Sequence, residues 1–300
     1  VMAVRQTGCA MLATSSVQEI MDIAPVAHLA AMKGRLPFVH FFDGFRTSHE
    51  IQKVEALEYD DLAKFIDYDA LQEFRDRSLS PNHPVIRGTA QNPDIYFQAR
   101  EASNPFYDNI IGIVEDYMNR LNALTGRDYG LFNYYGGKDP EYLIISMGSV
   151  CQTIEETIDY HNENGESYGL VNVHLFRPFS IRHFLEKIPA SVKAIAVLDR
   201  TKEPGAIGEP LYEDVRNCFY GREHAPIIVG GRFGLGSKDT TPDHITSVFD
   251  NLKQENPKNH FTIGITDDIT YTSLERTEIP DTTPKGTISC KFWGLGSDGT

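Results

Sequence analysis

The glycine-rich stretch from Gly294 to Thr300 has the residue types of a phosphate-binding loop. It follows an apolar segment, residues 287–293, that we expect to form a strand. Glycines let backbone N–H groups come close to a phosphate, and serine or threonine hydroxyls add further donors. A turn that binds no ligand would need fewer glycines. The sequence therefore predicts an anion site formed by Gly294, Gly296, Ser297, Asp298, Gly299 and Thr300.

A second candidate is the polar loop that follows residues 36–42. Those residues, LPFVHFF, favour a strand, and Gly44 can take backbone conformations that other residues avoid. With a helix expected to start at Ser48, the order is strand, turn and helix, and open α/β sheets bind ligands where strands end. The loop is either a ligand-facing site or an ordinary surface connection. Its candidate residues are Asp43, Arg46, Thr47, Ser48, His49 and Glu50.

The first 135 residues predict a mixture of short strands and helices around this loop. A strand is expected at Met2–Val4, and Ser16 with Glu19 has the capping-box pattern of a helix that ends at Gly34. Broken helices are expected next, and then a long helix framed by a proline near its start and a glycine after its end. The broken helices cover 48–57, 60–66 and 69–77, and the long helix runs from Asn104 to the residue before Gly126.

An α/β rhythm begins after the aromatic, glycine-rich stretch 129–138, which we interpret as the connection to a new domain. Strands rich in Val, Ile and Leu alternate with amphipathic helices, so we predict a doubly wound, mainly parallel sheet covered on both faces. The strands are expected at 142–147, 169–175, 192–198, 226–229 and 261–265, and the helices at 153–162, 180–187, 209–219 and 242–252.

The loops after these strands should share one rim, and that rim carries five basic residues: Arg177, Arg200, Lys202, Arg232 and Lys238. They could hold an anion, or they could form salt bridges with a neighbouring domain. The interface interpretation is favoured, because residues 231–236 lack the GxGxxG order of a dinucleotide-binding loop.

Composition narrows the possible partners. The formal net charge is -14, so the surface as a whole is unsuited to nucleic acid or an anionic membrane, and no apolar run approaches the ~20 residues of a membrane helix. The scattered cysteines, Cys9, Cys151, Cys218 and Cys290, predict reduced thiols and no metal centre. The sequence starts and stops inside expected elements, and we therefore expect a piece of a larger polypeptide.

Seven blocks of the chain, in order, closely resemble the pyruvate:ferredoxin (flavodoxin) oxidoreductase family. Such long collinear blocks are far more specific than any single glycine motif. They are RQTGCAMLATSSVQEIMDIA from Arg5, HFFDGFRTSHEIQKVE from His40, RGTAQNPDIYFQAREASNPFYD from Arg87, LDRTKEPGAIGEPLYEDV from Leu198, VGGRFGLGSKD from Val229, PKNHFTIGI from Pro257 and CKFWGLGSDGT from Cys290.

The resemblance implies a division of the chain into three parts. Residues 1–135 would be the latter part of a thiamine-fold domain, residues 136–275 a domain similar to the C-terminal domain of transketolase, and residues 276–300 the linker and start of a third, coenzyme A-associated domain. The implied activity is oxidative decarboxylation of pyruvate with coenzyme A, and electrons pass through iron–sulfur clusters to ferredoxin or flavodoxin. A flavin-fused variant that reduces NADP, or a purely scaffolding and dimer-interface role, are the alternatives.

The resemblance also implies the cofactors, partners and sites. Thiamine diphosphate, Mg²⁺ and [4Fe–4S] clusters would serve the complete enzyme, and most of their ligands would lie outside these 300 residues. The loop from Asp43 to Glu50 would border the thiamine and pyruvate pocket without supplying a catalytic residue, and the loop from Gly294 would contact coenzyme A. The expected partners are the remaining domains of the polypeptide, ferredoxin or flavodoxin, and a second copy in a homodimer. The expected location is the cytoplasm, or a hydrogenosome or mitochondrion-related organelle in a eukaryote.

Overall fold

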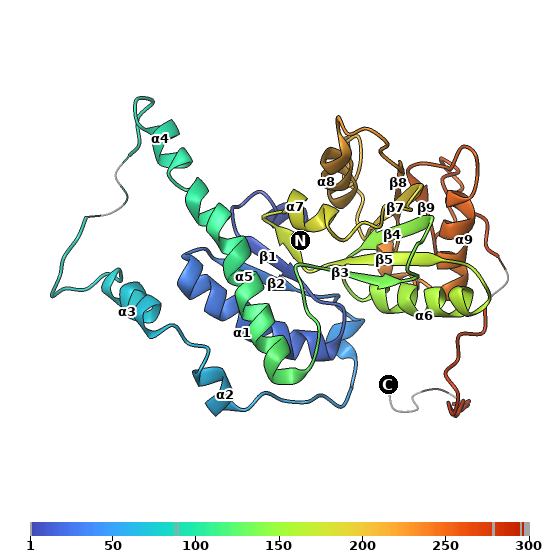
Figure 1. The fold of residues 1–300 in the computed structure, drawn as a ribbon, viewed down its shortest axis with the longest axis horizontal. Helices are drawn as coiled ribbons and strands as arrows, with labels where there is room; N and C mark the ends of the chain where they lie inside the picture. Colours follow the sequence, from blue (N-terminus) through green and yellow to red (C-terminus); the bar gives the residue numbers. More distant parts are fainter. Residues whose placement is uncertain (1, 87, 89, 278–279, 295, 297–300) are drawn as a thin grey trace.

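A computed structural model describes residues 2–86, 88, 90–277, 280–294 and 296, and within them two β-sheets (Figure 1). One sheet has six strands in the order β3-β5-β4-β7-β8-β9, and the other has three in the order β2-β1-β6. The strands are β1 (Ala10–Ala13), β2 (Phe38–Phe41), β3 (Phe132–Gly136), β4 (Tyr142–Ser146), β5 (Tyr168–Val173), β6 (Leu175–Arg177), β7 (Ala194–Asp199), β8 (Ile227–Arg232) and β9 (Phe261–Thr262).

Helices cover these sheets and form a long excursion between β2 and β3. The α-helices are α1 (Val17–Gly34), α2 (Tyr59–Ala63), α3 (Tyr68–Asp76), α4 (Tyr96–Glu101), α5 (Asn104–Thr125), α6 (Val150–Glu163), α7 (Ile181–Leu185), α8 (Pro210–Phe219) and α9 (Pro242–Leu252). Short 3₁₀ helices are η1 (Met2–Val4), η2 (Thr47–His49) and η3 (Leu235–Ser237).

The six-stranded sheet is parallel except for β3, which runs antiparallel to β5. Alternate residues of β4 face opposite sides, because side chains along a strand point alternately up and down. Ile144 packs in a core with residues of α6 and α9, whereas Leu143 and Ile145 belong to a second core with residues of α8. The prediction of a doubly wound, mainly parallel sheet with both faces covered is confirmed.

The three-stranded sheet packs against α1 and α5. Strand β1 is parallel to β2 and antiparallel to β6. Gly34, at the end of α1, lets the two helices approach, since a Cβ there would lie 2.0 Å from Ile110 Cδ1. Strand β6 follows β5 after one residue but pairs in the other sheet, and the chain therefore ties the two sheets together directly.

Several predicted elements are wrong. Met2–Val4 is a 3₁₀ helix, and the first strand instead spans Ala10–Ala13, which is fully buried. The stretch 129–138 is more than a connection, because it contributes β3. Residues 287–293 form no strand.

The helix expected from Ser48 is limited to the single turn η2, and residues 50–58 are non-helical. Backbone groups of Glu55 bond instead to the side chain of Gln18, with Glu55 N to Gln18 Oε1 at 2.8 Å and Gln18 Nε2 to Glu55 O at 3.0 Å. A tertiary contact has replaced the local helical bonds.

The excursion between β2 and α5, residues 50–103, is defined here as the arm. It contains α2, α3 and α4 and reaches away from both sheets on the left of Figure 1. Among its described residues none is buried. The arm therefore has no core of its own in this chain.

Candidate functional site

The carboxylate of Asp43 connects the loop after β2 with two loops of the six-stranded sheet. Asp43 Oδ2 accepts hydrogen bonds from Ser149 N (2.6 Å) and Ser149 Oγ (2.7 Å), and Asp43 Oδ1 lies 2.6 Å from Arg200 Nη1. Ser149 precedes α6 and Arg200 follows β7. The side chains of Asp43 and Arg200 are 17% and 25% exposed, so water only partly screens the pair.

This contact lies where open α/β sheets bind ligands. Strand β4 connects through α6 to β5 on one side, whereas β7 pairs with β4 on the other, so the chain reverses its direction across the sheet between β4 and β7. The crevice outside such a switch point is the usual ligand site, and the N-terminus of the following helix favours an anion. Here the carboxylate of Asp43 occupies that position beside α6.

Gly148 allows the carboxylate to come this close. Its φ is +83°, in the left-handed region, and a Cβ on it would lie 2.6 Å from Asp43 Oδ2. Both the backbone conformation and the approach of Asp43 therefore favour glycine.

Two hollows flank the Asp43–Arg200 pair. One, of about 350 Å³, is mainly apolar, with lining residues that include Phe41, Phe42, Met147, Phe176 and Leu198. The other, of about 230 Å³, is polar and is lined by Arg46, Ser149, Thr153, Lys238 and Asp239 among others. Asp43 lines the first hollow, Arg46 the second, and Arg200 both.

The remaining predicted residues of the loop divide into buried and exposed sets. Arg46 donates to Ser237 O (2.9 Å) and forms an ion pair with Asp239, so it too contacts the rim of the six-stranded sheet. Thr47 is 3% exposed, and its hydroxyl has no hydrogen-bond partner among the described residues. Ser48, His49 and Glu50 are exposed.

The backbone of this loop differs from the prediction at Gly44. The left-handed residue is Phe45 (φ 62°) instead, and nothing lies within 4 Å of a Cβ built on Gly44. The Phe45 ring stacks on His49 with ring centroids 5.0 Å apart, and Phe45 N donates to Ser48 Oγ (2.9 Å). The ring contact and the hydrogen bond hold Phe45, Ser48 and His49 together on the exposed side of the loop.

Of the five basic residues predicted for one rim, Arg200 and Lys238 line the same polar hollow, whereas Arg177, Lys202 and Arg232 do not line it. Arg200 contacts Asp43, as the interface interpretation expected. Arg177 lies in β6 and pairs with Asp214 (2.7 Å), and Arg232 is largely buried in β8, where it donates to His260 O (2.9 Å). Lys202 and Lys238 are exposed. The prediction failed for Arg177 because β6 leaves the six-stranded sheet.

A second polar cluster joins the two sheets and carries no local sequence signal. The Cys151 thiol lies 3.3 Å from Asn172 Oδ1, and Asn172 Nδ2 donates to Ser15 Oγ (3.0 Å). Glu19 Oε2 accepts from Ser15 N (2.5 Å) and lies 3.6 Å from His174 Nε2, beyond hydrogen-bond distance. These residues come from the turn after β1, from α1, from α6, and from β5 and the residue that follows it, so only the tertiary fold brings them together.

Burial strongly affects ionisation in this region. It opposes ionisation of Glu19, but hydrogen bonds and the charge of His174 outweigh it, and the pKa of Glu19 is lowered. Burial raises the pKa of Glu155 to about 7, and the negative charges of Glu19 and Asp159 raise it further. Complete burial likewise raises the pKa of the Cys151 thiol, which disfavours a reactive thiolate.

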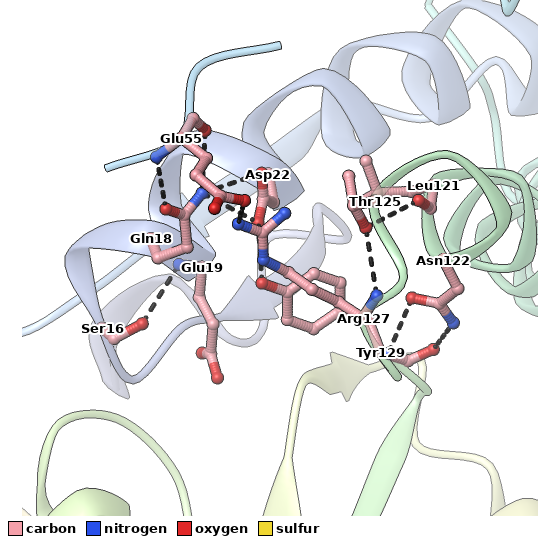
Figure 2. Close-up of polar contacts among 10 residues, drawn as sticks. All are labelled: Ser16, Gln18, Glu19, Asp22, Glu55, Leu121, Asn122, Thr125, Arg127 and Tyr129. Carbon is pink, nitrogen blue, oxygen red and sulfur yellow. Dashed lines mark hydrogen bonds and ion pairs between the residues drawn. The ribbon is translucent and has the colours of Figure 1, made fainter. Parts of the chain in front are cut away.

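A third network anchors the start of the arm (Figure 2). The carboxylate of Asp22, fully buried in α1, accepts from Tyr129 Oη (2.7 Å) and lies 3.3 Å from Arg127 Nε. Arg127 Nη2 also bonds Glu55 Oε2 at 2.8 Å, and Gln18 bonds both the Glu55 backbone and Asp22. Burial and the Asp22 carboxylate raise the pKa of Tyr129, which keeps its hydroxyl a donor.

No set of metal ligands occurs among the described residues. No group of three or more His, Cys, Asp or Glu side chains there could hold an ion. Cys9, Cys151, Cys218 and Cys290 are free and come from different elements or loops, so they do not fit an iron–sulfur cluster.

The glycine-rich stretch is described only in part. Gly294 and Gly296 are exposed, and Gly296 has a left-handed φ of +102°, which suits close approach of backbone to a ligand. Ser297, Asp298, Gly299 and Thr300 lie outside the described residues.

Within the described part of the chain, helices are too short or too polar to cross a bilayer.

These features define an α/β chain in which a unit built on a three-stranded sheet supplies a carboxylate to the switch point of a doubly wound unit. Residues 1–119 match the family described as pyruvate flavodoxin/ferredoxin oxidoreductase, thiamine diphosphate-binding, and residues 140–245 match pyruvate:ferredoxin oxidoreductase core domain II. The chain belongs to the pyruvate:ferredoxin/flavodoxin oxidoreductase family and corresponds to part of such a protein.

Curated relatives align with this chain from end to end. A pyruvate-flavodoxin oxidoreductase of Enterobacter agglomerans is 62% identical over 99% of this chain and 26% of its own length. A pyruvate:ferredoxin oxidoreductase of Moorella thermoacetica is also 62% identical, over 100% of this chain and 26% of its own length. A pyruvate dehydrogenase [NADP(+)] of Cryptosporidium parvum is 48% identical over 100% of this chain and 16% of its own length. The chain thus spans about a quarter or less of these relatives.

Proposed function

We propose that this chain is part of an enzyme that oxidatively decarboxylates pyruvate with coenzyme A, giving acetyl-CoA and CO₂, and passes electrons to ferredoxin or flavodoxin. The observation that supports this is the 62% identity over nearly the whole chain to proteins named for that activity. The test is pyruvate-dependent reduction of ferredoxin or flavodoxin by the full-length protein, with acetyl-CoA as product. Reduction with another 2-oxo acid but not with pyruvate would contradict the proposal.

A second candidate is transfer of the electrons to NADP. It is supported by the 48% identity to the pyruvate dehydrogenase [NADP(+)] of Cryptosporidium parvum. The full-length protein separates the two candidates directly, because pyruvate-dependent NADPH formation without added ferredoxin or flavodoxin would favour the second.

Thiamine diphosphate, when bound, supplies the carbanion chemistry that decarboxylation of a 2-oxo acid needs. Because the described residues contain no metal-ligand set, we propose that Mg²⁺ and the [4Fe–4S] clusters are held elsewhere in the oxidoreductase. The division near residues 135 and 275, the homodimer and the location in the cytoplasm or a related organelle also remain proposals.

Within this enzyme the loop after β2 is proposed to have two roles. Asp43 and Arg46 hold the two sheets together, as their contacts with Ser149, Arg200 and Ser237 support. The exposed residues Ser48, His49 and Glu50 face outward and are proposed to border the thiamine and pyruvate pocket, with Thr47 packed beneath them.

Two variants of the full-length enzyme separate these roles. Arg46→Ala should lower thermal stability, since Arg46 contacts a rim loop, whereas His49→Ala should change the affinity for pyruvate or thiamine diphosphate with little effect on stability. If both variants change only stability or dimer content, the loop is a scaffold alone.

The glycine-rich stretch is proposed to contact coenzyme A through backbone N–H groups. Replacing Gly296 and Asp298 in the full-length enzyme should raise the coenzyme A requirement while pyruvate-dependent cluster reduction stays largely intact. An unchanged coenzyme A response would remove this stretch from the site.

A further inference from the structure

The arm exposes many large apolar side chains, as does the C-terminal segment with Phe292 and Trp293. The tip of the arm is defined here as residues 79–86 and 90–97. Large apolar side chains of the tip are mostly exposed to solvent. Their exposed fractions are Leu79 72%, Val85 52%, Ile86 93%, Ile95 50%, Tyr96 54% and Phe97 66%. Single exposed apolar residues are ordinary, but a concentration of them marks a surface that another molecule covers.

The base of the arm packs on this chain, whereas the tip does not. Leu57, Phe65 and Ile66 contact the core that contains α1 and α5, and Lys33 lies 3.4 Å from Asp67. Together with the Gln18 and Arg127 contacts of Glu55, these interactions fix where the arm leaves the body (Figure 2). A tip carried on a fixed base is suited to a permanent contact.

Local structure alone would not stabilise the tip. Helix α4 has six residues, and backbone bonds near its start, from Tyr96 N to Asn92 O and from Ala99 N to Ile95 O, are local. Isolated helices shorter than ~12 residues are marginal in water, because nucleation is costly, and the support that α4 has within the chain comes from α5, which starts three residues after α4 ends. Tertiary packing of Tyr96 and Phe97 is what would hold such a helix.

The charge of the arm indicates the kind of surface that it fits. Residues 50–103 contain eleven acidic and six basic side chains, and ten of the acidic ones lie outside residues 79–97, so most of the negative charge flanks the apolar tip instead of lying within it. A complementary surface is an apolar groove with a basic rim. About three quarters of the length of the relatives lies outside the aligned region, so most of the surface of such an oxidoreductase belongs to other parts.

We propose that the tip of the arm, residues 79–86 and 90–97, docks into an apolar groove with a basic rim on the part of the same oxidoreductase polypeptide outside these 300 residues. The docked tip orders α4 and fixes the start of α5, whose apolar stripe of Ile110, Val114, Tyr117, Met118 and Leu121 is buried. The docking contact uses none of the residues proposed to border the pyruvate pocket. It also does not involve the contact of Asp43 with Ser149 and Arg200, which we call the Asp43 joint.

Photocrosslinking of the full-length oxidoreductase tests the proposal. The photoreactive residue p-benzoylphenylalanine replaces Phe97 and, as a control away from the arm, Tyr220, which is 90% exposed. Irradiation of the Phe97 variant should give an adduct with the mass of one chain, joined to a peptide outside the 300 residues. An adduct of two chains, an adduct only with added ferredoxin or flavodoxin, attachment within the 300 residues, or no protein adduct would each overturn it.

Hydrogen exchange gives a second test that does not need the photoreactive residue. In the unmodified full-length enzyme, a docked α4 should exchange its amides at least about 100-fold more slowly than an undocked helix of six residues. Phe97→Ser should remove most of that protection, whereas Tyr220→Ser should not. Exchange of α4 at the unprotected rate in the unmodified enzyme would refute docking.

Discussion

Replacing Asp43 by alanine tests whether its carboxylate joins the two sheets. Hydrogen bonds to a charged group contribute about 1.5–3 kcal/mol each, and a partly exposed ion pair contributes less than ~1 kcal/mol. Because Asp43 is 17% exposed, we take the lower value for its two bonds from Ser149 and a small share for Arg200. The expected loss is about 3 kcal/mol, or on the order of 100-fold in an opening equilibrium.

Hydrogen exchange of the full-length enzyme measures this loss locally. Amides in the first turn of α6, such as Cys151 N and Gln152 N, should exchange on the order of 100-fold faster in Asp43→Ala, because the turn opens when the joint separates. Asp43→Asn keeps the size and one acceptor oxygen, so its effect should be smaller.

Glu141 provides the matched control. Its carboxylate also lies 2.6 Å from a cation, Lys193, but the two side chains are 48% and 66% exposed. Exposed pairs contribute at most ~1 kcal/mol, so Glu141→Ala should change exchange by less than about fivefold. Equal effects of Asp43→Ala and Glu141→Ala on α6 would refute the joint.

Three further variants follow from the same geometry. Gly148→Ala should destabilise the joint by about 1–2 kcal/mol, because the new Cβ is strained at this φ and meets Asp43. The loss should be smaller when Asp43 is also alanine, and thermal melting of the wild type, the two single variants and the double variant measures this coupling. Burial raises the pKa of Asp199 to about 7. Between about pH 4 and pH 7 the Asp199 carboxyl is therefore ionised in the unfolded chain but still protonated in the folded chain. The free energy of unfolding should fall as the pH rises through this window. Asp199→Asn should remove that part of the fall, seen as a smaller difference in melting temperature between pH 5 and pH 8, and an unchanged difference would contradict it. Gln18→Ala removes two bonds to the Glu55 backbone and should speed exchange at Glu55 by roughly tenfold or more, whereas unchanged exchange would show that the other contacts of the arm's base hold Glu55 without Gln18.

The sequence predicted well those elements whose signals are local. Ser16 begins α1 through a bond from Glu19 N (3.1 Å), and Thr241 begins α9 at the expected Pro242. The buried parallel strands were also located, because uninterrupted Val, Ile and Leu runs between amphipathic helices are typical of strands covered on both faces. In these elements, capping and hydrophobic periodicity agree with the tertiary fold.

Elements that depend on distant partners were misjudged. Strand β6 pairs with β1, more than 160 residues earlier, and nothing local distinguishes it from a continuation of β5. The same holds for 50–58, where a glutamine in α1 replaces helical bonds with bonds to its own side chain. Tertiary packing decides the strand pairing of β6 and the backbone conformation of 50–58, and a single sequence does not show which distant residues pack together.

The loop after β2 was located correctly from the sequence, but the contacts that its side chains make were not predicted. Its sequence predicted a polar loop at the end of a strand, and the structure has one there, but Asp43 meets Ser149 and Arg200, which lie 106 and 157 positions away. Those partners come from the second sheet, so the local sequence does not identify the joint.

The Asp43 joint also limits where ligands can bind in this part of the oxidoreductase. An anion that bound Ser149 N and Arg200 at the β4–β7 switch point would have to displace the Asp43 carboxylate, which already accepts from Ser149 N and pairs with Arg200. Displacement would leave Asp43, which is 17% exposed, without its charged partner, and an unpaired, partly buried charge is costly. At Ser149 N and Arg200, the doubly wound unit therefore uses the crevice in which related folds bind a ligand to hold its neighbour instead.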